Sequence, residues 1–256
     1  MASFRDFLIA GQFLTRLPVP AAWQTDWTME DLRDSVLMFP LVGLLVGLLG
    51  SLVYAVAISC SLPPVLAAVL AVAALVLVTG GLHEDGLADV ADGFGGGRTR
   101  EQKLDIMRDS RLGSYGAIGL MLSLAFRTGA IAHLAAAEEV AAALLASAAL
   151  SRAAMPAAML LSAPARRDGL AASAGRPDRV QAFLGIALAV LVSFLALPFG
   201  AVVVAVALCG VVAWAFLRLA QRQIGGITGD VLGGMQQILE IACLAAIVAW
   251  TVDRPI

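Results

Sequence analysis

Residues 36–83 read VLMFPLVGLLVGLLGSLVYAVAISCSLPPVLAAVLAVAALVLVTGGLH and contain no Asp, Glu, Lys or Arg. A helix needs about 20 consecutive apolar residues to cross a bilayer, so this run is long enough for two crossings. Pro63 and Pro64 interrupt it, and proline ends a helix because it lacks a backbone N–H and clashes with the preceding turn. We therefore predict membrane-spanning helices at residues 36–61 and 65–82.

The rest of the chain follows the same pattern. Residues 180–217 also lack charged side chains, and Pro198 and Gly200 divide them. The whole chain is 60% hydrophobic and only 14% charged, whereas soluble domains average about 25% charged residues. The predicted fold is an all-α, polytopic transmembrane helix bundle that forms a single integral membrane domain over residues 1–256. Its seven predicted spans are 36–61, 65–82, 112–137, 140–163, 180–197, 201–217 and 231–252.

The N-terminal segment is too polar and too short for a span. Its apolar residues recur at helical spacing, which is typical of an interfacial or re-entrant helix; they are Phe4, Phe7, Leu8, Gly11 and Leu14. Thr28 and Asp31 have the spacing of a capping box, in which each side chain bonds the backbone N–H at the other's position. We expect this box to open the first span.

The basic residues predict how the bundle is oriented. Fourteen of the 17 Lys and Arg residues fall in four segments, 1–35, 83–111, 164–179 and 218–230, which seven spans place on one side of the membrane. The other side holds only Arg254, and Arg127 and Arg152 lie within spans. Positive charge concentrates on the cytoplasmic side of membrane proteins. We therefore predict a cytoplasmic N-terminus and a bacterial inner-membrane, multi-pass location.

An acidic segment, HEDGLADVAD at residues 83–92, follows the second predicted span. Asp85 and Asp92 lie within ~20° of each other on a helix, and Asp89 falls close to the same stripe. Three carboxylates near a membrane repel one another and are costly to bury, and a divalent cation removes that cost. Mg²⁺ prefers oxygen ligands and often bridges carboxylates to substrate phosphates. We expect a Mg²⁺ site at these three aspartates; a plain solvated loop is the alternative.

Neighbouring residues extend this candidate site over the cytoplasmic loop 83–111. His83 is a candidate substrate contact or metal ligand, or a structural hydrogen-bonding residue. Three glycines in the segment 94–100 leave the backbone free to approach an anion, and Arg98 and Arg100 could grip phosphate; a flexible connector is the alternative. Asp109 could be a fourth carboxylate, an arginine partner or a plain surface charge.

Polar residues elsewhere are weaker candidates. Arg152 and Arg127 lie within spans, where an arginine needs a partner or a phosphate, and function and a structural ion pair are equally open for each. Thr228 and Asp230 begin the last span on the same membrane face as the aspartates, and either join the site or cap the helix.

Several stretches resemble the cobalamin synthase family, the adenosylcobinamide-GDP ribazoletransferases. The resemblance runs from near residue 4 to near residue 250, and its central motif is long and specific. The matching stretches are GGLHEDGLADVADGF at 80–94, GGRTR at 96–100, IMRDSRLG at 106–113, FLTRLP at 13–18 and GITGD at 226–230.

The resemblance implies a late step of vitamin B12 assembly. The enzyme would join adenosylcobinamide-GDP to α-ribazole or its 5′-phosphate, release GMP and use Mg²⁺ at Asp85, Asp89 and Asp92. One aspartate, Asp89 or Asp92, would serve as general base, and Arg98, Arg100, Arg108 and Arg111 are candidate phosphate clamps. The implied partners are these small molecules and the lipid bilayer, with no nucleic acid. Both a monomer and a homo-oligomer fit the sequence.

Two other functions fit the sequence less well. CDP-alcohol phosphotransferases, which are also membrane enzymes, open with Asp-Gly-x-x-Ala-Arg, but here Asp89 follows Ala88. A transporter would carry its acids near mid-membrane and show repeat symmetry, whereas this acidic segment lies at the edge of a span and the chain shows no repeat.

Overall fold

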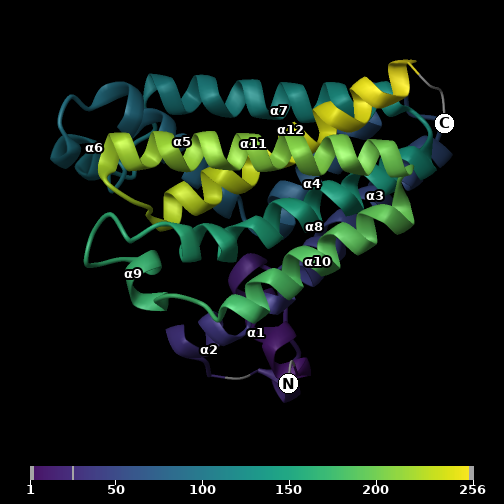
Figure 1. The fold of residues 1–256 in the computed structure, drawn as a ribbon. Coiled ribbons are helices and arrows are strands. Elements are labelled where there is room, and N and C mark those ends of the chain that lie inside the picture. The colour runs from purple at the N-terminus through teal and green to yellow at the C-terminus, as the bar shows by residue number, and fades with distance from the viewer. Residues whose placement is uncertain (1–2, 25, 254–256) are drawn as a thin grey trace.

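The computed structural model describes residues 3–24 and 26–253, and in these ranges it is built of helices joined by short turns (Figure 1). The helices, with two 3₁₀ turns, are α1 Phe4–Leu14, η1 Ala21–Trp23, α2 Met29–Asp34, η2 Val36–Met38, α3 Phe39–Ser59, α4 Pro64–Thr79, α5 Leu82–Gly96, α6 Arg100–Ile106, α7 Ser114–Leu134, α8 Ala137–Leu161, α9 Leu170–Ala174, α10 Arg179–Ala196, α11 Phe199–Ile224 and α12 Gly229–Asp253.

Within the described residues, six helices are long and apolar enough to cross a membrane: α3 with η2, α7, α8, α10, α11 and α12. A seventh crossing exists only if α4 and α5 count as one broken span, because the chain bends by 90° between them. The all-α bundle and a helix at each predicted span are thus confirmed. The second span differs from a plain crossing, since α4 ends at Thr79 and the chain turns into the acidic helix α5.

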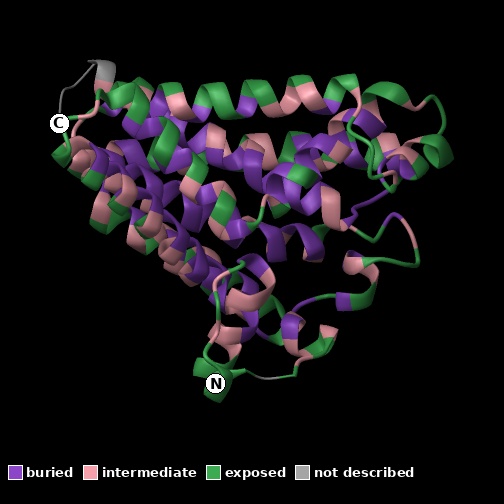
Figure 2. Ribbon diagram, turned by 180° about the vertical axis from the view of Figure 1, so that it is seen from behind, coloured by how far each residue is buried: buried purple, intermediate pink, exposed green. Residues whose placement is uncertain are grey.

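The centre of the bundle is formed by α8 and α12, whose residues are mostly buried, whereas most residues of α7, α10 and α11 are intermediate or exposed (Figure 2). Small residues let α3 approach α8 closely. A Cβ at Gly43 would lie 2.3 Å from the carbonyl oxygen of Ala148, and one at Gly47 would lie 2.6 Å from that of Leu144. Glycine at such positions lets two backbones meet, which is how helices associate in a membrane.

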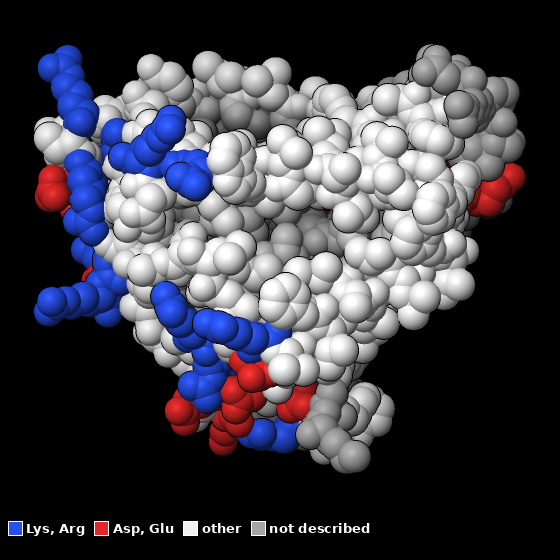
Figure 3. Space-filling view, in the orientation of Figure 1, with Lys and Arg blue, Asp and Glu red and all other residues white. Residues whose placement is uncertain are grey.

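Charged residues gather at one end of the bundle. In Figure 3 most of the visible Lys and Arg side chains lie at the left and lower left, the end where Figure 1 places α1, α2, α6 and α9. The four segments predicted to share one membrane face therefore lie at one end of the molecule. Arg254, the single basic residue predicted for the other face, lies outside the described residues.

Three local predictions need correction. The capping box of Thr28 and Asp31 is present, but it opens the short helix α2 rather than the first span. The helix α11 continues to Ile224, seven residues beyond its predicted end, so Arg218 and Arg222 are helical. The expected glycine-rich loop is shorter than predicted because α5 continues to Gly96.

Candidate active site

The acidic helix α5 begins at a turn made by two glycines. Gly80 and Gly81 both have positive φ angles, +65° and +70°, a conformation that residues with a side chain rarely adopt. The turn ends α4 and directs α5 across the charged end of the bundle. The helix that the acidic spacing predicted is therefore present, and its N-terminus lies where the chain leaves the bundle core.

Asp85 and Asp89 lie one turn apart on α5. The Asp85 residue is exposed and Asp89 is half-buried. The Asp89 carboxylate lies within electrostatic reach of Asp85, Asp92 and Asp230, and of one positive charge, Arg166. Like charges this close cost energy when they are partly removed from water. We call Asp85, Asp89 and Asp230, together with Arg166, the aspartate cluster; Asp92 is described separately below. With three carboxylates and one arginine, the aspartate cluster attracts a cation.

Asp230 reaches this cluster because α5 and α12 pack closely. A Cβ at Gly86 would lie 2.8 Å from the carbonyl oxygen of Asp230, and one at Gly234 would lie 3.3 Å from that of Gly86. Larger residues at these positions would separate the two helices. The predicted membership of Asp230 in the candidate site fits this arrangement, which brings together residues 145 positions apart in the chain, Asp85 and Asp230.

The turn before α12 fixes Asp230 and Arg166. The Thr228 hydroxyl donates to the Asp230 carboxylate at 3.1 Å and accepts from the Val231 N–H at 3.2 Å, so Thr228 caps α12 and orients Asp230. Segments 163–165 and 226–227 form a short parallel bridge, in which the Ala165 N–H donates to the Ile227 carbonyl at 2.8 Å. This bridge places an Arg166 guanidinium nitrogen 3.7 Å from the Asp230 carboxylate.

A cavity of about 180 Å³ lies beside these carboxylates. Asp85, Asp230 and His83 line one part of it, and apolar residues such as Phe13 and Met155 line another. Ligand sites commonly combine apolar walls with a few polar groups. The cavity therefore offers apolar walls next to carboxylates that can hold a cation.

Asp92 has a different environment from the other two aspartates. It is buried, and its two carboxylate oxygens accept hydrogen bonds from the backbone N–H groups of Gly113 and Gly116, both at 2.8 Å. Gly113 is the N-cap residue of α7 and Gly116 lies in its first turn, where backbone donors lack partners within the helix. Asp92 thus caps α7 from outside, and the capping bonds engage both of its oxygens.

The carboxylates do not converge as the stripe on α5 predicted. Among residues 3–24 and 26–253, no three or more His, Cys, Asp or Glu side chains are grouped to hold a metal ion. Asp92 is turned toward α7, which leaves Asp85 and Asp89, with Asp230 nearby. Mg²⁺ usually takes one or two protein carboxylates and completes its shell with water and phosphate oxygens. The all-oxygen pair of Asp85 and Asp89 fits that mode, and metal binding itself stays a prediction.

Glu84 belongs to a buried charged network rather than to the aspartate cluster. Arg127 on α7 contacts Glu84 at 2.8 Å and Glu240 on α12 at 2.9 Å, and all three side chains are less than 10% exposed. Gln237 accepts from Arg127 at 2.9 Å. Arg152 on α8 lies 3.8 Å from Glu240. The network joins α5, α7, α8 and α12, so Arg127 has the ion pairs that the sequence left open.

Arg152 lies too deep to act on a substrate directly in this conformation, whereas His83 is buried but lines the cavity beside Asp85 and Asp230. Arg152 is 2% exposed and donates to the Ala148 carbonyl at 3.1 Å. His83 is fully buried, and neither of its ring nitrogens has a hydrogen-bond partner in the described part of the chain. Of the two roles left open for Arg152, the structure shows the ion pair with Glu240, and a phosphate contact stays a prediction. A catalytic role for His83 stays a prediction.

The arginines proposed as phosphate clamps differ in their availability. Arg100 donates to the carbonyls of Ile224, at 2.8 Å, and Ala165, so it ties α6 to the end of α11. Arg108 pairs with Asp168, and Arg111 with Asp109, each at 2.5 Å.

Arg111 hydrogen bonds lower the pKa of Asp109 to about 2. Asp109 is therefore an arginine partner, one of its three predicted roles. Arg98 is exposed and stays a candidate for phosphate.

A family model described as cobalamin-5-phosphate synthase matches residues 6–248. The chain belongs to this family. It is 47% identical to an adenosylcobinamide-GDP ribazoletransferase of Bradyrhizobium diazoefficiens, over 97% of this chain and 95% of that protein. Proteins of the same name from Mesorhizobium japonicum and Azorhizobium caulinodans are 46% and 44% identical, over 93% and 96% of this chain and 91% and 96% of theirs. No solved structure matches the chain.

The family resemblance and the sequence pattern did not reveal two parts of this site. Arg166 was used only as one of the basic residues of segment 164–179 that predict the membrane orientation, because nothing in its local sequence links it to Asp230. The Glu84–Arg127–Glu240 network was also missed as a unit. Gln236 and Glu240, spaced i and i+4 on α12, both face the interior and share a 2.7 Å hydrogen bond. The charged side chains within predicted spans were the available signal in the sequence. Only the tertiary structure showed which of these side chains form ion pairs with one another.

Proposed function

We propose that this chain is an adenosylcobinamide-GDP ribazoletransferase. It joins adenosylcobinamide-GDP to α-ribazole, or to α-ribazole 5′-phosphate, and releases GMP. The observation that carries this proposal is 47% identity, over 97% of the chain, to a protein of that name. The chemistry of the aspartate cluster supports it, because the donor substrate contains a pyrophosphate. The family match also favours this activity over a CDP-alcohol phosphotransferase or a transporter.

The reaction needs a nucleophile placed against a phosphorus atom and a leaving group whose charge is stabilised. The ribose hydroxyl of α-ribazole attacks the phosphorus nearer cobinamide, and the bond to GMP breaks. Asp85 and Asp89 would hold Mg²⁺, which supplies charge neutralisation for the pyrophosphate when bound. Asp230 is oriented by Thr228 at the same cavity. Arg166, held near Asp230, supplies a positive charge beside this cluster.

The proton of the attacking hydroxyl needs an acceptor. Asp92 is poorly suited, since both of its oxygens already accept backbone hydrogen bonds. Asp89 lies half-buried in the same cluster as Asp85 and Asp230, and a carboxylate oxygen that does not hold Mg²⁺ can accept the proton. We therefore assign the acceptor role to the Asp89 carboxylate and a positioning role to Asp92, which holds α5 against α7.

The proposed setting is the bacterial inner membrane, with the charged end of the bundle in the cytoplasm. The clustering of Lys and Arg at that end supports this orientation, and nucleotide substrates are cytoplasmic. Cys60 follows α3 at the opposite end and is exposed. A membrane-impermeant maleimide should label Cys60 in intact cells with a permeabilised outer membrane. A Cys60→Ser, Ser110→Cys variant should be labelled only after lysis, and the reverse pattern would refute this orientation.

The activity test uses the purified full-length chain in liposomes with adenosylcobinamide-GDP and α-ribazole. GMP should appear only with both substrates and Mg²⁺, and a chelator should stop its release until Mg²⁺ is restored. Asp89→Asn should lower kcat by at least ~100-fold, the order expected for loss of a general base. Asp85→Asn should raise the Mg²⁺ concentration needed for half-maximal rate. The matched control is Asp105→Asn, an exposed carboxylate on α6, which should leave turnover unchanged.

Each arm of this experiment can refute a distinct statement. If the folded wild-type protein released no GMP, the proposed activity would be wrong. If Asp89→Asn kept its full Mg²⁺-dependent turnover, the activity would stand but the assignment of Asp89 would fail. Equal turnover in chelator would refute the proposed cofactor.

A further inference from the structure

A second cavity is separate from the aspartate cluster. It has a volume of about 620 Å³ and is lined by α8, α10, α11 and α12. It shares no lining residue with the cavity that contains Asp85 and Asp230. Figure 1 shows the cause: α10 and α11 meet at the turn that joins them and diverge toward the charged end of the bundle. Its volume falls within the ~300–1,000 Å³ typical of ligand sites.

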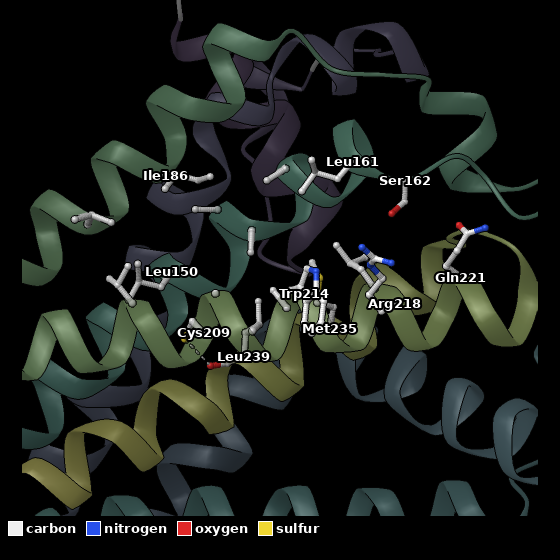
Figure 4. A pocket seen from close by; sticks show the side chains of 18 residues that line it. Leu150, Leu161, Ser162, Ile186, Cys209, Trp214, Arg218, Gln221, Met235 and Leu239 are labelled. Atoms are coloured by element: carbon white, nitrogen blue, oxygen red, sulfur yellow. Dashed lines mark hydrogen bonds between the residues drawn. The ribbon is translucent and has the colours of Figure 1, made fainter.

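The lining of this cavity is apolar along most of its length and polar at one end. Small and aliphatic side chains such as Leu150, Ile186 and Leu239 line the apolar part of the cavity (Figure 4). The polar side chains of Arg218, Gln221 and Ser162 lie together at one end of it. The polar end is the one nearest the charged end of the bundle, because Arg218 and Gln221 lie in the last two turns of α11. The lining of the cavity therefore changes from apolar to polar toward the charged end of the bundle.

Arg218 carries a charge that no carboxylate neutralises within the part of the chain the structure describes. None of the ion pairs found there includes it; its guanidinium lies instead 5.5 Å from the centre of the Trp214 ring, one turn earlier on α11. Stacking of this kind orients a guanidinium while leaving its edge N–H groups free for an anion. Arg218 is thus a positive group at the polar end of an otherwise apolar cavity.

The surroundings of the cavity limit which molecules can enter it. The outward faces of α10 and α11 expose large apolar side chains, among them Phe183, Leu191, Val203 and Val211. These faces belong to helices long and apolar enough to cross a membrane, so in the bilayer they contact lipid tails. A molecule that reaches the cavity between them comes from the bilayer, and the free charge at the cytoplasmic end selects a negative head group.

We propose that this cavity binds an anionic phospholipid, with an acyl chain between α10 and α11 and the phosphate on Arg218. Basic pockets between transmembrane helices at the cytoplasmic side are known to suit anionic lipid head groups, and arginine pairs with phosphate through two parallel N–H donors. Gln221 and Ser162 add a donor and a hydroxyl for the head group. The lipid fills the cavity that α8, α10, α11 and α12 line.

Native mass spectrometry of the full chain in detergent tests this proposal. The protein is titrated with phosphatidylglycerol and, separately, with phosphatidylcholine of the same acyl chains. One arginine near the surface of an anionic lipid contributes about 1 kcal/mol, which is about fivefold in affinity. Phosphatidylcholine also has a phosphate, but the positive charge of its choline group cancels the net charge of the head group. Phosphatidylglycerol should therefore bind about fivefold more tightly than phosphatidylcholine to the wild-type protein.

Two variants separate the head-group site from the apolar part. Arg218→Gln should abolish the preference for phosphatidylglycerol, whereas Arg176→Gln, an exposed arginine at the same end that does not line the cavity, should keep it. Gly210→Leu places a side chain in the cavity, and a Cβ there meets no atom within 4 Å. This variant should weaken binding of both lipids while retaining the wild-type melting temperature.

Three results would overturn the proposal. The first is equal affinity of the wild-type protein for the two lipids. The second is an unchanged lipid preference in Arg218→Gln, which would locate the charge effect elsewhere on the basic surface. The third is a dimer that dissociates in folded Gly210→Leu, which would show that the groove is covered by a second copy of the chain.

Discussion

Replacing Arg127 should destabilise the bundle more than replacing any charged residue at the surface. Its guanidinium is 2% exposed and contacts the carboxylates of Glu84 at 2.8 Å and Glu240 at 2.9 Å. Arg127→Gln leaves a buried network of two glutamates with one arginine, Arg152. Breaking a buried pair from one side costs about 3–5 kcal/mol, because the remaining charge stays buried without its partner.

This cost can be read as a change in melting temperature. For a chain of this size, 1 kcal/mol corresponds to about 2–4 °C, so Arg127→Gln should lower the melting temperature by about 6–20 °C. The assay is thermal unfolding of the purified protein in one detergent, followed by circular dichroism. Arg33→Gln is the control, since Arg33 forms ion pairs only at the surface, and it should leave the melting temperature unchanged.

The balance of charge in the network gives a sharper test. Glu84→Gln together with Arg127→Gln removes one charge of each sign and leaves the pair of Arg152 and Glu240. The double variant should therefore recover a large part of the stability that Arg127→Gln loses. If the double variant unfolded at a lower temperature than Arg127→Gln, or if Arg127→Gln melted like the wild-type protein, the charge-balance reasoning would be wrong.

Two further predictions concern the packing around α5. Asp92→Ala should lower stability by about 0.5–2 kcal/mol, the usual cost of losing a helix cap, whereas Asp85→Ala should not, because Asp85 is exposed; equal melting temperatures would contradict the capping role. Gly86→Ala should lower both stability, by about 1–3 kcal/mol, and GMP release, since its Cβ would lie 2.8 Å from the Asp230 carbonyl oxygen. Gly96→Ala on the same helix, where the nearest atom is at 3.5 Å, should do neither, because alanine has the higher helix propensity; a similar loss in both variants would show that the close approach to α12 is not responsible.

Much of this protein follows from local patterns in its sequence. Charge-free runs and prolines predicted a helix at each of seven positions, because the length and polarity of a segment decide whether it can cross a bilayer. The spacing of Asp85, Asp89 and Asp92 predicted an acidic helix, since helical periodicity is local. The motif at residues 80–94 predicted the family that the comparisons show.

Tertiary structure decided which of these residues share a site. Side-chain partners on other helices set the role of each carboxylate: α7 amides engage Asp92, Arg127 neutralises Glu84, and α12 brings Asp230 to Asp85. A sequence pattern places a residue on a face of its own helix but does not say which helix packs against that face. That choice depends on close contacts such as Gly86 against α12, which form only when the whole bundle is assembled.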